Sequence, residues 1–345
     1  MCEKIVEPLL AWYAVNKRTL PWRQDCNPYH VWVSEIMLQQ TRVDTVIPYY
    51  LRFLAALPTV EALANAPEDQ LLKLWEGLGY YSRVRNMKKA ANQIMNECGG
   101  KFPCTREGLL QLSGVGPYVS GAIGSIAFNQ PFPAVDGNVL RVFARVRGDA
   151  SDIALASTRK KTEQIVAQLM PPGRCGAFTQ ALMELGACVC LPNGAPRCES
   201  CPIRFCCRAS AENRIAELPV KSSAKPRRIE EKTILVAQCG QHFALRRRPA
   251  TGLLAGLWEL PSLPDKCSTE QVMAEFRANL TLPPEPLGAA KHIFSHIEWH
   301  MTGFHLTLID RAAFPDAEWF TAEQIRVQLS VPTAFSAYSA FFSKF

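Results

Sequence analysis

The sequence predicts two domains: a mainly α-helical N-terminal domain and a smaller C-terminal α/β domain. In the N-terminal part, apolar residues recur at helical spacing, as in residues 3–16, and prolines separate these runs. Beyond residue 232 the pattern changes to alternating and β-branched runs, first Thr233–Gln238 and then Phe243–Arg246. Between the two parts, residues 217–231 are rich in proline, serine and basic side chains, which is typical of a linker.

The composition fits a globular protein that has a sizeable core. The chain has 345 residues, of which 48% are hydrophobic and 20% charged. The net charge of +7 is compatible with a polyanionic partner. We expect no membrane span, because no run of about eighteen apolar residues occurs. We also expect a cytoplasmic location, where the 13 cysteines are metal ligands or buried thiols more often than disulfides.

The stretch Leu112–Tyr118 predicts a tight turn between two helices. Gly114 and Gly116 permit positive φ and close backbone approach, and Pro117 suits the first position of the helix that follows. The free N–H groups of that helix start favour a phosphate, as in a helix-hairpin-helix DNA clamp. The alternative is an ordinary turn between helices.

A second motif, Val135–Val139, carries Asp136 and Asn138. An Asp before a glycine is most often a turn or a helix cap. Together with the hairpin, however, this string resembles the helix-hairpin-helix base-excision DNA glycosylases, and most closely the adenine DNA glycosylases that remove adenine opposite 8-oxoguanine. The resemblance implies that Gly114 and Gly116 bind DNA and that Asp136, with Asn138, faces the sugar. A carboxylate there stabilises the positive charge that develops when the base leaves.

Glu35 lies in an apolar stretch of a predicted helix over residues 31–42. Burial there would raise the pKa of this carboxyl, as a general acid near neutral pH requires. The alternative is an exposed helical glutamate. The string from Ser34 to Thr41 closely matches the catalytic helix of adenine DNA glycosylases. This resemblance implies that Glu35 protonates the leaving adenine, and that Gln40 and Thr41 reach into the duplex near the lesion.

Tyr118 stands where related enzymes that also cut the DNA strand carry a lysine. The lysine amine forms a Schiff base with the sugar, and a tyrosine cannot. The resemblance therefore favours a glycosylase without a dedicated lyase step. It also implies that Trp22 and Arg23 form walls of the adenine pocket. Tyr80 would be a wedge beside 8-oxoguanine, and Gln180 would contact the flipped adenine.

Four cysteines carry the metal-binding signal: Cys190, Cys198, Cys201 and Cys207. Four thiolates suit either tetrahedral zinc or an iron–sulfur cluster. The resemblance implies a [4Fe–4S] cluster, although seven residues separate the first two cysteines here and six is the commoner family spacing. Cys206 adjoins Cys207 and is the alternative fourth ligand.

The C-terminal part resembles a Nudix-type fold in residues 254–261, but residues 262–280 lack the acidic metal-binding helix of a Nudix hydrolase. We therefore expect a binding domain without hydrolytic activity. The resemblance implies that Phe294, Ser295 and His296 form a loop that senses 8-oxoguanine; the alternative is a loop that holds Phe294 in a core. His292, His296 and His300 are four apart, but the surrounding residues predict a strand-turn-strand unit and not a metal-binding helix.

These expectations give a catalytic helix-hairpin-helix glycosylase domain with a cluster loop over residues 1–216, a linker over 217–231 and a Nudix-like 8-oxoguanine recognition domain over 232–345. We expect a monomer that is associated with the nucleoid. It would remove adenine, by hydrolysis of the N-glycosidic bond, from double-stranded DNA that contains A:8-oxoguanine or A:G mispairs. One alternative is a bifunctional, endonuclease III-like glycosylase-lyase for damaged pyrimidines. The other is a non-enzymatic, zinc-containing DNA-binding protein.

Overall fold

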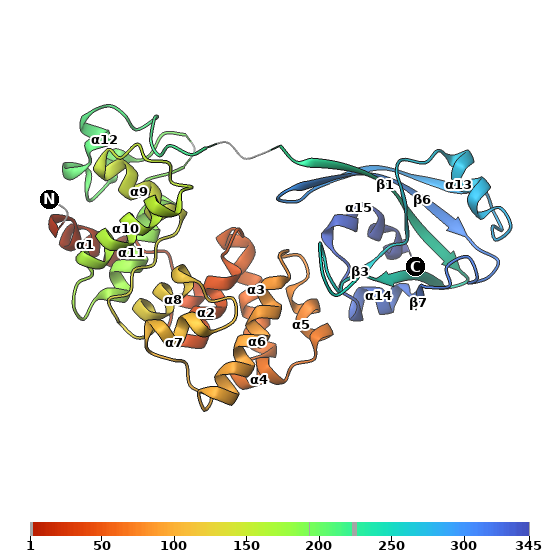
Figure 1. Cartoon of the computed structure of the whole chain (residues 1–345), viewed down its shortest axis with the longest axis horizontal. Coiled ribbons are helices and arrows are strands. Elements are labelled where there is room, and N and C mark those ends of the chain that lie inside the picture. The colour runs from red at the N-terminus through yellow and green to blue at the C-terminus, as the bar shows by residue number, and fades with distance from the viewer. Residues whose placement is uncertain (1–2, 193, 223–225, 345) are drawn as a thin grey trace. The chain divides into compact units, whose positions relative to one another are not determined.

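The computed structural model describes residues 3–192, 194–222 and 226–344. The chain forms two compact units (Figure 1). The first unit contains residues 1–65 and 86–223, and the second contains residues 66–85 and 224–345. No helix in the described ranges is long and apolar enough to cross a membrane.

The first unit is built from helices. Its elements before residue 128 are η1 (Glu3–Ile5), α1 (Val6–Asn16), η2 (Pro21–Arg23), α2 (Pro28–Met37), α3 (Val43–Ala56), α4 (Val60–Asn65), α6 (Ser82–Glu97, which begins in the second unit), α7 (Arg106–Gln111), α8 (Pro117–Ala122) and the π-helical turn η3 (Ile123–Ala127). The elements after it are α9 (Gly137–Arg147), α10 (Ala156–Leu169), α11 (Cys175–Cys188), η4 (Cys198–Ser200), η5 (Arg204–Cys206) and α12 (Arg208–Ala211).

One hydrophobic core joins the start of the chain to its residues beyond 135. Ile5 and Leu9 of the first turns pack with Phe143 of α9 and Phe178 of α11, and all four side chains are at most 2% exposed. Half-buried cysteines of the predicted cluster motif border this core. Burial of these apolar surfaces anchors the cysteine loop to α11 and to α9, whose N-cap residue is Asp136.

Helix α2 begins at a well-formed cap and ends earlier than predicted. The side chain of Asn27 accepts a hydrogen bond from the backbone N–H of Tyr29 (2.9 Å), and Pro28 occupies the first helical position. The predicted helix over 31–42 is wrong at its C-terminal end, because α2 stops at Met37. Gln40 adopts a left-handed φ of 58°, which no α-helix continues.

The predicted turn between two helices is confirmed, with α7 before it and α8 after it. Gly114 has φ 74°, and a Cβ atom there would lie 2.7 Å from Cβ of Asn86, so both the backbone angle and the space require glycine. Gly116 precedes α8 as its N-cap residue, and Pro117 begins the helix. Proline removes one of the N–H groups that a helix start leaves free.

The second unit is a mixed β-sheet with helices. Its elements are α5 (Glu68–Trp75), β1 (Arg228–Cys239), β2 (His242–Arg247), β3 (Trp258–Glu259), β4 (Ser262–Pro264), α13 (Thr269–Phe276), β5 (Glu285–Ile293), β6 (Ile297–Thr307), β7 (Glu318–Thr321), α14 (Ala322–Gln328), η6 (Thr333–Phe335), α15 (Ser336–Ser339) and η7 (Ala340–Lys344). The strand order is β3-β2-β1-β6-β5, while β4 pairs with β1 and β7 with β2. The long β1–β6 pair is parallel and the other pairs are antiparallel.

The sheet buries both of its faces. Along β1, Ile234 and Val236 belong to one core with α14 and α15, whereas Leu235 and Ala237 belong to another with α13. Successive side chains of a strand point to opposite faces, so β1 reads as a continuous apolar run. Figure 1 shows α13 and α15 beside this sheet.

The strand-turn-strand prediction around the histidines is confirmed by the antiparallel β5–β6 pair. His292 lies opposite Trp299, and Lys291 lies opposite His300. In strand geometry these histidines do not form one helical face. Among the described residues, no group of three His, Cys, Asp or Glu side chains is placed to hold a single metal ion.

Residues 66–85 belong to the second unit, although they lie far from its other residues in the sequence. The Nζ atom of Lys73 donates to the carbonyl of Leu329 (2.8 Å), and the N–H of Val331 donates to the carboxylate of Glu76 (2.9 Å). These contacts join α5 and its C-terminal end to the segment after α14. The domain boundaries predicted at residues 216 and 232 remain predictions.

Candidate active site and cysteine cavity

Eight of the residues predicted for catalysis or DNA contact line one pocket in the first unit. Its cavity volume is roughly 190 Å³, well above the roughly 10–15 Å³ that one water molecule needs on the same measure. The predicted residues in its lining are Trp22, Arg23, Glu35, Thr41, Tyr118, Asp136, Asn138 and Gln180. They come from η2, α2, α8, α9, α11 and intervening turns, so only the folded chain brings them together.

Glu35 is buried in α2, with 5% of its surface exposed. Burial is the largest influence on its pKa and raises it, because the charged form loses its solvation. A hydrogen bond from Tyr118 opposes this effect, the charge of Asp136 adds to it, and Arg23 opposes it. The net result raises the pKa of Glu35 to about 7. A carboxyl group with this pKa is protonated often enough near neutral pH to donate a proton.

Tyr118 donates a short hydrogen bond from its hydroxyl to the carboxylate of Glu35. Burial and the neighbouring carboxyls of Glu35 and Asp136 raise the pKa of Tyr118 well above its usual value, so the phenol stays protonated. The sequence places Tyr118 among the candidate catalytic residues because it stands where related lyases carry a lysine. In the structure it positions the carboxyl group of Glu35.

Asp136 caps the N-terminus of α9. One carboxylate oxygen accepts from the N–H of Val139 (2.8 Å), and the other accepts from the side-chain amide of Asn138 (2.7 Å). Burial raises the pKa of Asp136, and these two donors oppose the rise by stabilising the carboxylate. The cap reading and the catalytic reading of Asp136 are therefore compatible, because capping fixes the carboxylate at the pocket wall.

The pocket also contains an ion network that the sequence analysis missed. Glu184 of α11 has no exposed side-chain surface and binds Arg18 through two guanidinium contacts of 2.8 Å. Arg23 donates to the same carboxylate at 2.7 Å. Burial raises the pKa of Glu184, but the arginines outweigh it and lower the pKa to about 2. Glu184 lies among apolar residues in the sequence, as Glu35 does, and this pattern could have identified it as a candidate.

The remaining predicted DNA contacts lie outside this pocket. Gln40 is exposed in the turn after α2, and Gly114 and Gly116 form the hairpin before α8. Tyr80 and the loop of Phe294, Ser295 and His296 belong to the second unit.

Within the second unit, the hydroxyls of Tyr80 and Ser295 lie 3.0 Å apart and form a hydrogen bond. Tyr80 has φ 48° and is 48% exposed. Phe294 is half-buried with its ring edge-on to Trp299 (4.9 Å between centroids), whereas Ser295 and His296 are exposed. The loop thus anchors Phe294 against a core and leaves the two polar side chains accessible; its role in sensing 8-oxoguanine remains a prediction.

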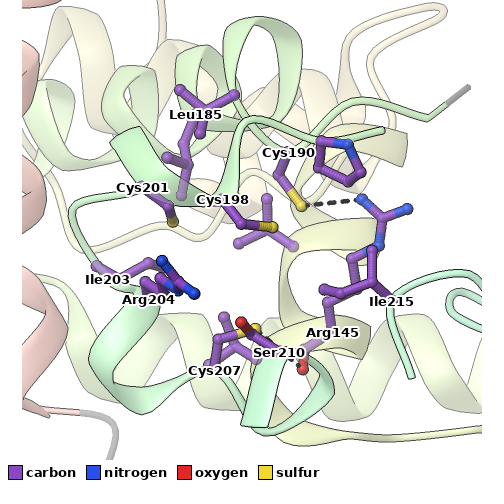
Figure 2. A pocket seen from close by; sticks show the side chains of 14 residues that line it. Arg145, Leu185, Cys190, Cys198, Cys201, Ile203, Arg204, Cys207, Ser210 and Ile215 are labelled. Atoms are coloured by element: carbon purple, nitrogen blue, oxygen red, sulfur yellow. Dashed lines mark hydrogen bonds between the residues drawn. The ribbon is translucent and has the colours of Figure 1, made fainter. Parts of the chain in front are cut away.

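The four predicted cysteine ligands line one cavity in the first unit, and Figure 2 shows their sulfur atoms turned toward a common space. Cys206 does not belong to this lining, and its thiol bonds the carbonyl of Ile203 (3.2 Å). This geometry favours Cys207 over Cys206 as the fourth ligand. The four thiols surround a shared cavity, and an all-thiol donor set suits either zinc or an iron–sulfur cluster.

Burial raises the pKa of the Cys201 thiol to about 11 and also raises that of Cys207. Without a bound cation these thiols hold their protons, and binding of iron or zinc would release them. The metal affinity of such a site therefore depends on pH.

A chain of hydrogen bonds connects the cysteine cavity to the pocket. Arg141 of α9 donates to the carbonyl of Cys190 (2.8 Å) and to the side-chain oxygen of Asn138 (2.8 Å). Asn138 in turn donates to Asp136 (2.7 Å). Helix α11 packs closely against α9 at this point: a Cβ atom on Gly186 would be only 2.5 Å from Cβ of Asn138. The orientation of Asp136 thus depends on a side chain that also contacts the cysteine loop.

Glu35→Gln is expected to stabilise the protein at alkaline pH. An unfolded glutamate has a pKa of about 4.3, and folding raises that of Glu35 to about 7. Between these values the folded state keeps a proton that the unfolded state has released, so stability falls as pH rises through this window. Glutamine has no such dependence, and it avoids a loss of up to about 4 kcal/mol above pH 7.

Urea unfolding of Glu35→Gln and of the natural protein at pH 5 and pH 8 measures this effect. The difference between the two free energies of unfolding should move in favour of the variant at pH 8. Glu61→Gln, at an exposed position of α4, is the matched control. An equal difference at the two pH values would contradict the raised pKa of Glu35.

Known proteins share both the sequence and the fold of this chain. Residues 33–172 match the family described as "HhH-GPD superfamily base excision DNA repair protein", and residues 233–340 match the NUDIX domain. The adenine DNA glycosylase of Rattus norvegicus is 38% identical, and the alignment covers 92% of this chain and 74% of the rat protein. The adenine DNA glycosylase of Homo sapiens is 37% identical, with 92% of this chain and 70% of the human protein covered.

Among solved structures, a thermostable thymine-DNA glycosylase is similar with a TM-score of 0.56 and 29% identity, over 61% of this chain and 97% of that one. The predicted fold class is therefore confirmed: a helix-hairpin-helix glycosylase domain followed by a Nudix-like α/β domain. The identity of 37–38% to these two adenine DNA glycosylases extends over 92% of this chain. The chain belongs to the adenine DNA glycosylase family.

Proposed function

We propose that this protein is a monofunctional DNA glycosylase, which flips adenine out of double-stranded DNA and hydrolyses its N-glycosidic bond when the adenine is mispaired with 8-oxoguanine or guanine. The observation that carries the proposal is one pocket that contains a buried carboxyl group with a pKa of about 7 beside a second, capped carboxylate. The adenine DNA glycosylases that the chain resembles support this choice of base. The proposed enzyme acts as a monomer in the cytoplasm, on the nucleoid.

The two carboxyl groups divide the reaction between them. Protonated Glu35 donates its proton to the adenine, which makes the base a better leaving group. As the bond breaks, positive charge develops on the sugar, and the carboxylate of Asp136 stabilises that charge. Asn138 and the start of α9 hold Asp136 in place. Water then adds to the sugar and leaves an abasic site, and the proton that this water releases returns the Glu35 carboxylate to its protonated form.

The walls of the pocket hold the flipped base. Trp22 is buried and offers an aromatic surface. Arg18 and Arg23, which donate hydrogen bonds to Glu184, line the same pocket. Extruding a base costs a few kcal/mol, which contacts of this kind offset. Gln180 adds an amide to the wall, and Thr41 lies in the turn at its edge. Gln40, in that same turn, and the hairpin glycines Gly114 and Gly116 contact the duplex outside the pocket.

Tyr118 argues against the glycosylase-lyase alternative. A lyase of that kind needs an amine that forms a Schiff base with the sugar. Tyr118 lacks an amine, and its hydroxyl is bonded to Glu35. The alternative of a non-enzymatic zinc protein is less well supported, because it does not explain why Glu35 is buried in a pocket with a raised pKa.

The second unit identifies the base opposite adenine. Compared with guanine, 8-oxoguanine has an additional N7–H donor and an oxygen acceptor on C8. The exposed Ser295 hydroxyl can accept from the first and donate to the second. His296 adds a further polar contact, Phe294 anchors the loop, and Tyr80 enters the duplex as a wedge.

Cys190, Cys198, Cys201 and Cys207 would hold a [4Fe–4S] cluster in the first unit. The shared cavity and the all-thiol donor set fit this group. When bound, the cluster would fix the cysteine loop and supply a redox-active centre. The reaction at Glu35 and Asp136 proceeds without a step at the cluster.

The first expectation concerns base excision. On a duplex with a single A:8-oxoguanine pair, the protein should release adenine, at a slower rate from A:G and hardly at all from A:T. Glu35→Gln and Asp136→Asn should each lower the single-turnover rate by at least about 100-fold, as loss of a general acid or a charge-stabilising group does. Gel analysis after alkaline cleavage of abasic sites measures the rates.

Glu61→Gln serves as the control and should retain the full rate. Binding of lesion DNA by Glu35→Gln should be nearly unchanged, which separates chemistry from recognition. Near-normal excision by Glu35→Gln would contradict the assigned acid. Efficient removal of damaged pyrimidines, with strand cleavage and borohydride trapping, would favour the lyase alternative instead.

The second expectation concerns pH. If protonated Glu35 is the acid, the single-turnover rate should fall about tenfold per pH unit once pH exceeds the pKa of about 7. Tyr118→Phe removes a hydrogen bond that lowers this pKa, so the descending limb should move to higher pH. Tyr338→Phe, a buried tyrosine of the second unit, should leave the limb in place. A limb that does not move in Tyr118→Phe would show that another group controls it.

The third expectation concerns Ser295. Ser295→Ala should reduce the preference for A:8-oxoguanine over A:G by tenfold to hundredfold, since a polar contact of this kind discriminates by roughly 1–3 kcal/mol. Ser336→Ala removes an exposed hydroxyl of the second unit outside this loop, and should therefore keep the preference. Equal preference in Ser295→Ala and the natural protein would exclude this hydroxyl as the sensor.

A further inference from the structure

We infer that Arg145 is a positioning residue for the cysteine-bound group: it donates a hydrogen bond to the Cys190 thiolate, supplies buried positive charge beside it, and so raises the reduction potential of a bound cluster and slows loss of its iron. The inference rests on the cluster proposed above. It goes beyond the ligand set, because Arg145 is not itself a ligand.

Arg145 lies in the last turn of α9 and is 4% exposed. Its Nη1 atom is 3.2 Å from the Cys190 sulfur and 2.9 Å from the carbonyl oxygen of Leu191. Its Nε atom donates to the carbonyl of Leu218 (2.8 Å). One side chain therefore joins the first cysteine of the motif to the segment that leaves the first unit.

The backbone of Arg145 meets a second cysteine ligand. While Cys207 is protonated, its thiol donates a hydrogen bond to this carbonyl oxygen (3.6 Å); deprotonation on metal binding would end that bond and leave the Nη1 contact to Cys190. Figure 2 shows Arg145 at the side of the cavity that Cys190 and Cys207 share. The same residue thus contacts the first and the last of the four cysteines, which are far apart in sequence.

The charge of Arg145 distinguishes it from the other arginine of the cavity lining. Arg204 is half exposed and pairs with Glu199. Within the described ranges, Arg145 forms no ion pair with a carboxylate, although burial of an unpaired charge is costly. Thiolates in the cavity would supply the missing negative charge. The buried guanidinium is therefore suited to an anionic group at the cysteines and not to four neutral thiols.

The effect on a cluster follows from the sign of the charge. Reduction adds an electron, and both a positive charge and an N–H donor to sulfur stabilise the more negative state. Arg145 should therefore raise the reduction potential. It should also retain the cluster, because it holds the Cys190 loop against Leu218.

The test uses the full-length protein purified without air. Iron, sulfide and zinc are measured first. Midpoint potentials and rates of iron release to a chelator are then compared among the natural protein, Arg145→Gln, Arg145→Lys and Arg204→Gln. The last is the matched control, since it removes a positive charge from the same cavity lining without a sulfur contact.

Arg145→Gln should lose iron about tenfold faster, and its potential should fall by about 59 mV, which corresponds to a tenfold change for one electron. Arg145→Lys should recover most of the potential, and Arg204→Gln should resemble the natural protein. For the case in which Arg145→Gln does not fold, resonance Raman spectra of the natural protein in H₂O and D₂O provide a second measurement. A deuterium shift of an Fe–S(Cys) stretch would show the hydrogen bond, and its absence would contradict it.

The outcomes separate this inference from the proposal on which it rests. Stoichiometric zinc, or no metal, overturns the cluster and the role of Arg145 together. An intact cluster whose potential and iron release are unchanged in Arg145→Gln, or changed equally in Arg204→Gln, overturns the role of Arg145 alone. Neither result alters the test of adenine excision.

Discussion

The burial of one carboxyl group, that of Glu35, is the constraint on which the rest of the first unit depends. An ionised carboxylate without partners inside a protein is very unfavourable, so the surrounding groups must settle its protonation state. Burial and Asp136 favour the neutral form, whereas Tyr118 and Arg23 favour the anion. Burial outweighs the other influences, and the resulting pKa of about 7 keeps the proton both present and transferable near neutral pH. Stability is sacrificed at this position, as is common where a protein places chemistry in its interior.

The surrounding architecture holds these competing groups at fixed positions. Asp136 is tied to the start of α9, Tyr118 lies in the first turn of α8, and Arg23 is bonded to Glu184 of α11. The close approach of α11 to α9 at Gly186 leaves no room for a side chain. Small displacements at any of these contacts would change the pKa of Glu35, so residues outside the pocket would influence the proposed proton transfer to the base.

Features with a local chemical signature were predictable from the sequence. Glu35 stands out because it interrupts an apolar run, and the cysteines stand out by spacing. Contacts between distant segments left no such signature: Arg18 and Glu184 are 166 residues apart, and nothing in the pattern links residues 66–85 to the second unit. The end of α2 was misjudged because its residues favour continuation, while the turn imposes a left-handed φ on Gln40. Family resemblance supplied the roles of many residues, and the fold supplied their neighbours.

The hydrogen bond between the hydroxyls of Tyr80 and Ser295 has a consequence for how a lesion is distinguished from a normal base. Each hydroxyl already has a hydrogen-bond partner before DNA binds. Contact with a base therefore replaces this bond with others, and the total number of hydrogen bonds need not increase. In such an exchange the net free energy is a small difference between similar terms. A base edge that both donates and accepts can complete the exchange. One that only accepts leaves part of the original bonding unreplaced, so selectivity can arise from an incomplete substitution as much as from a strong contact.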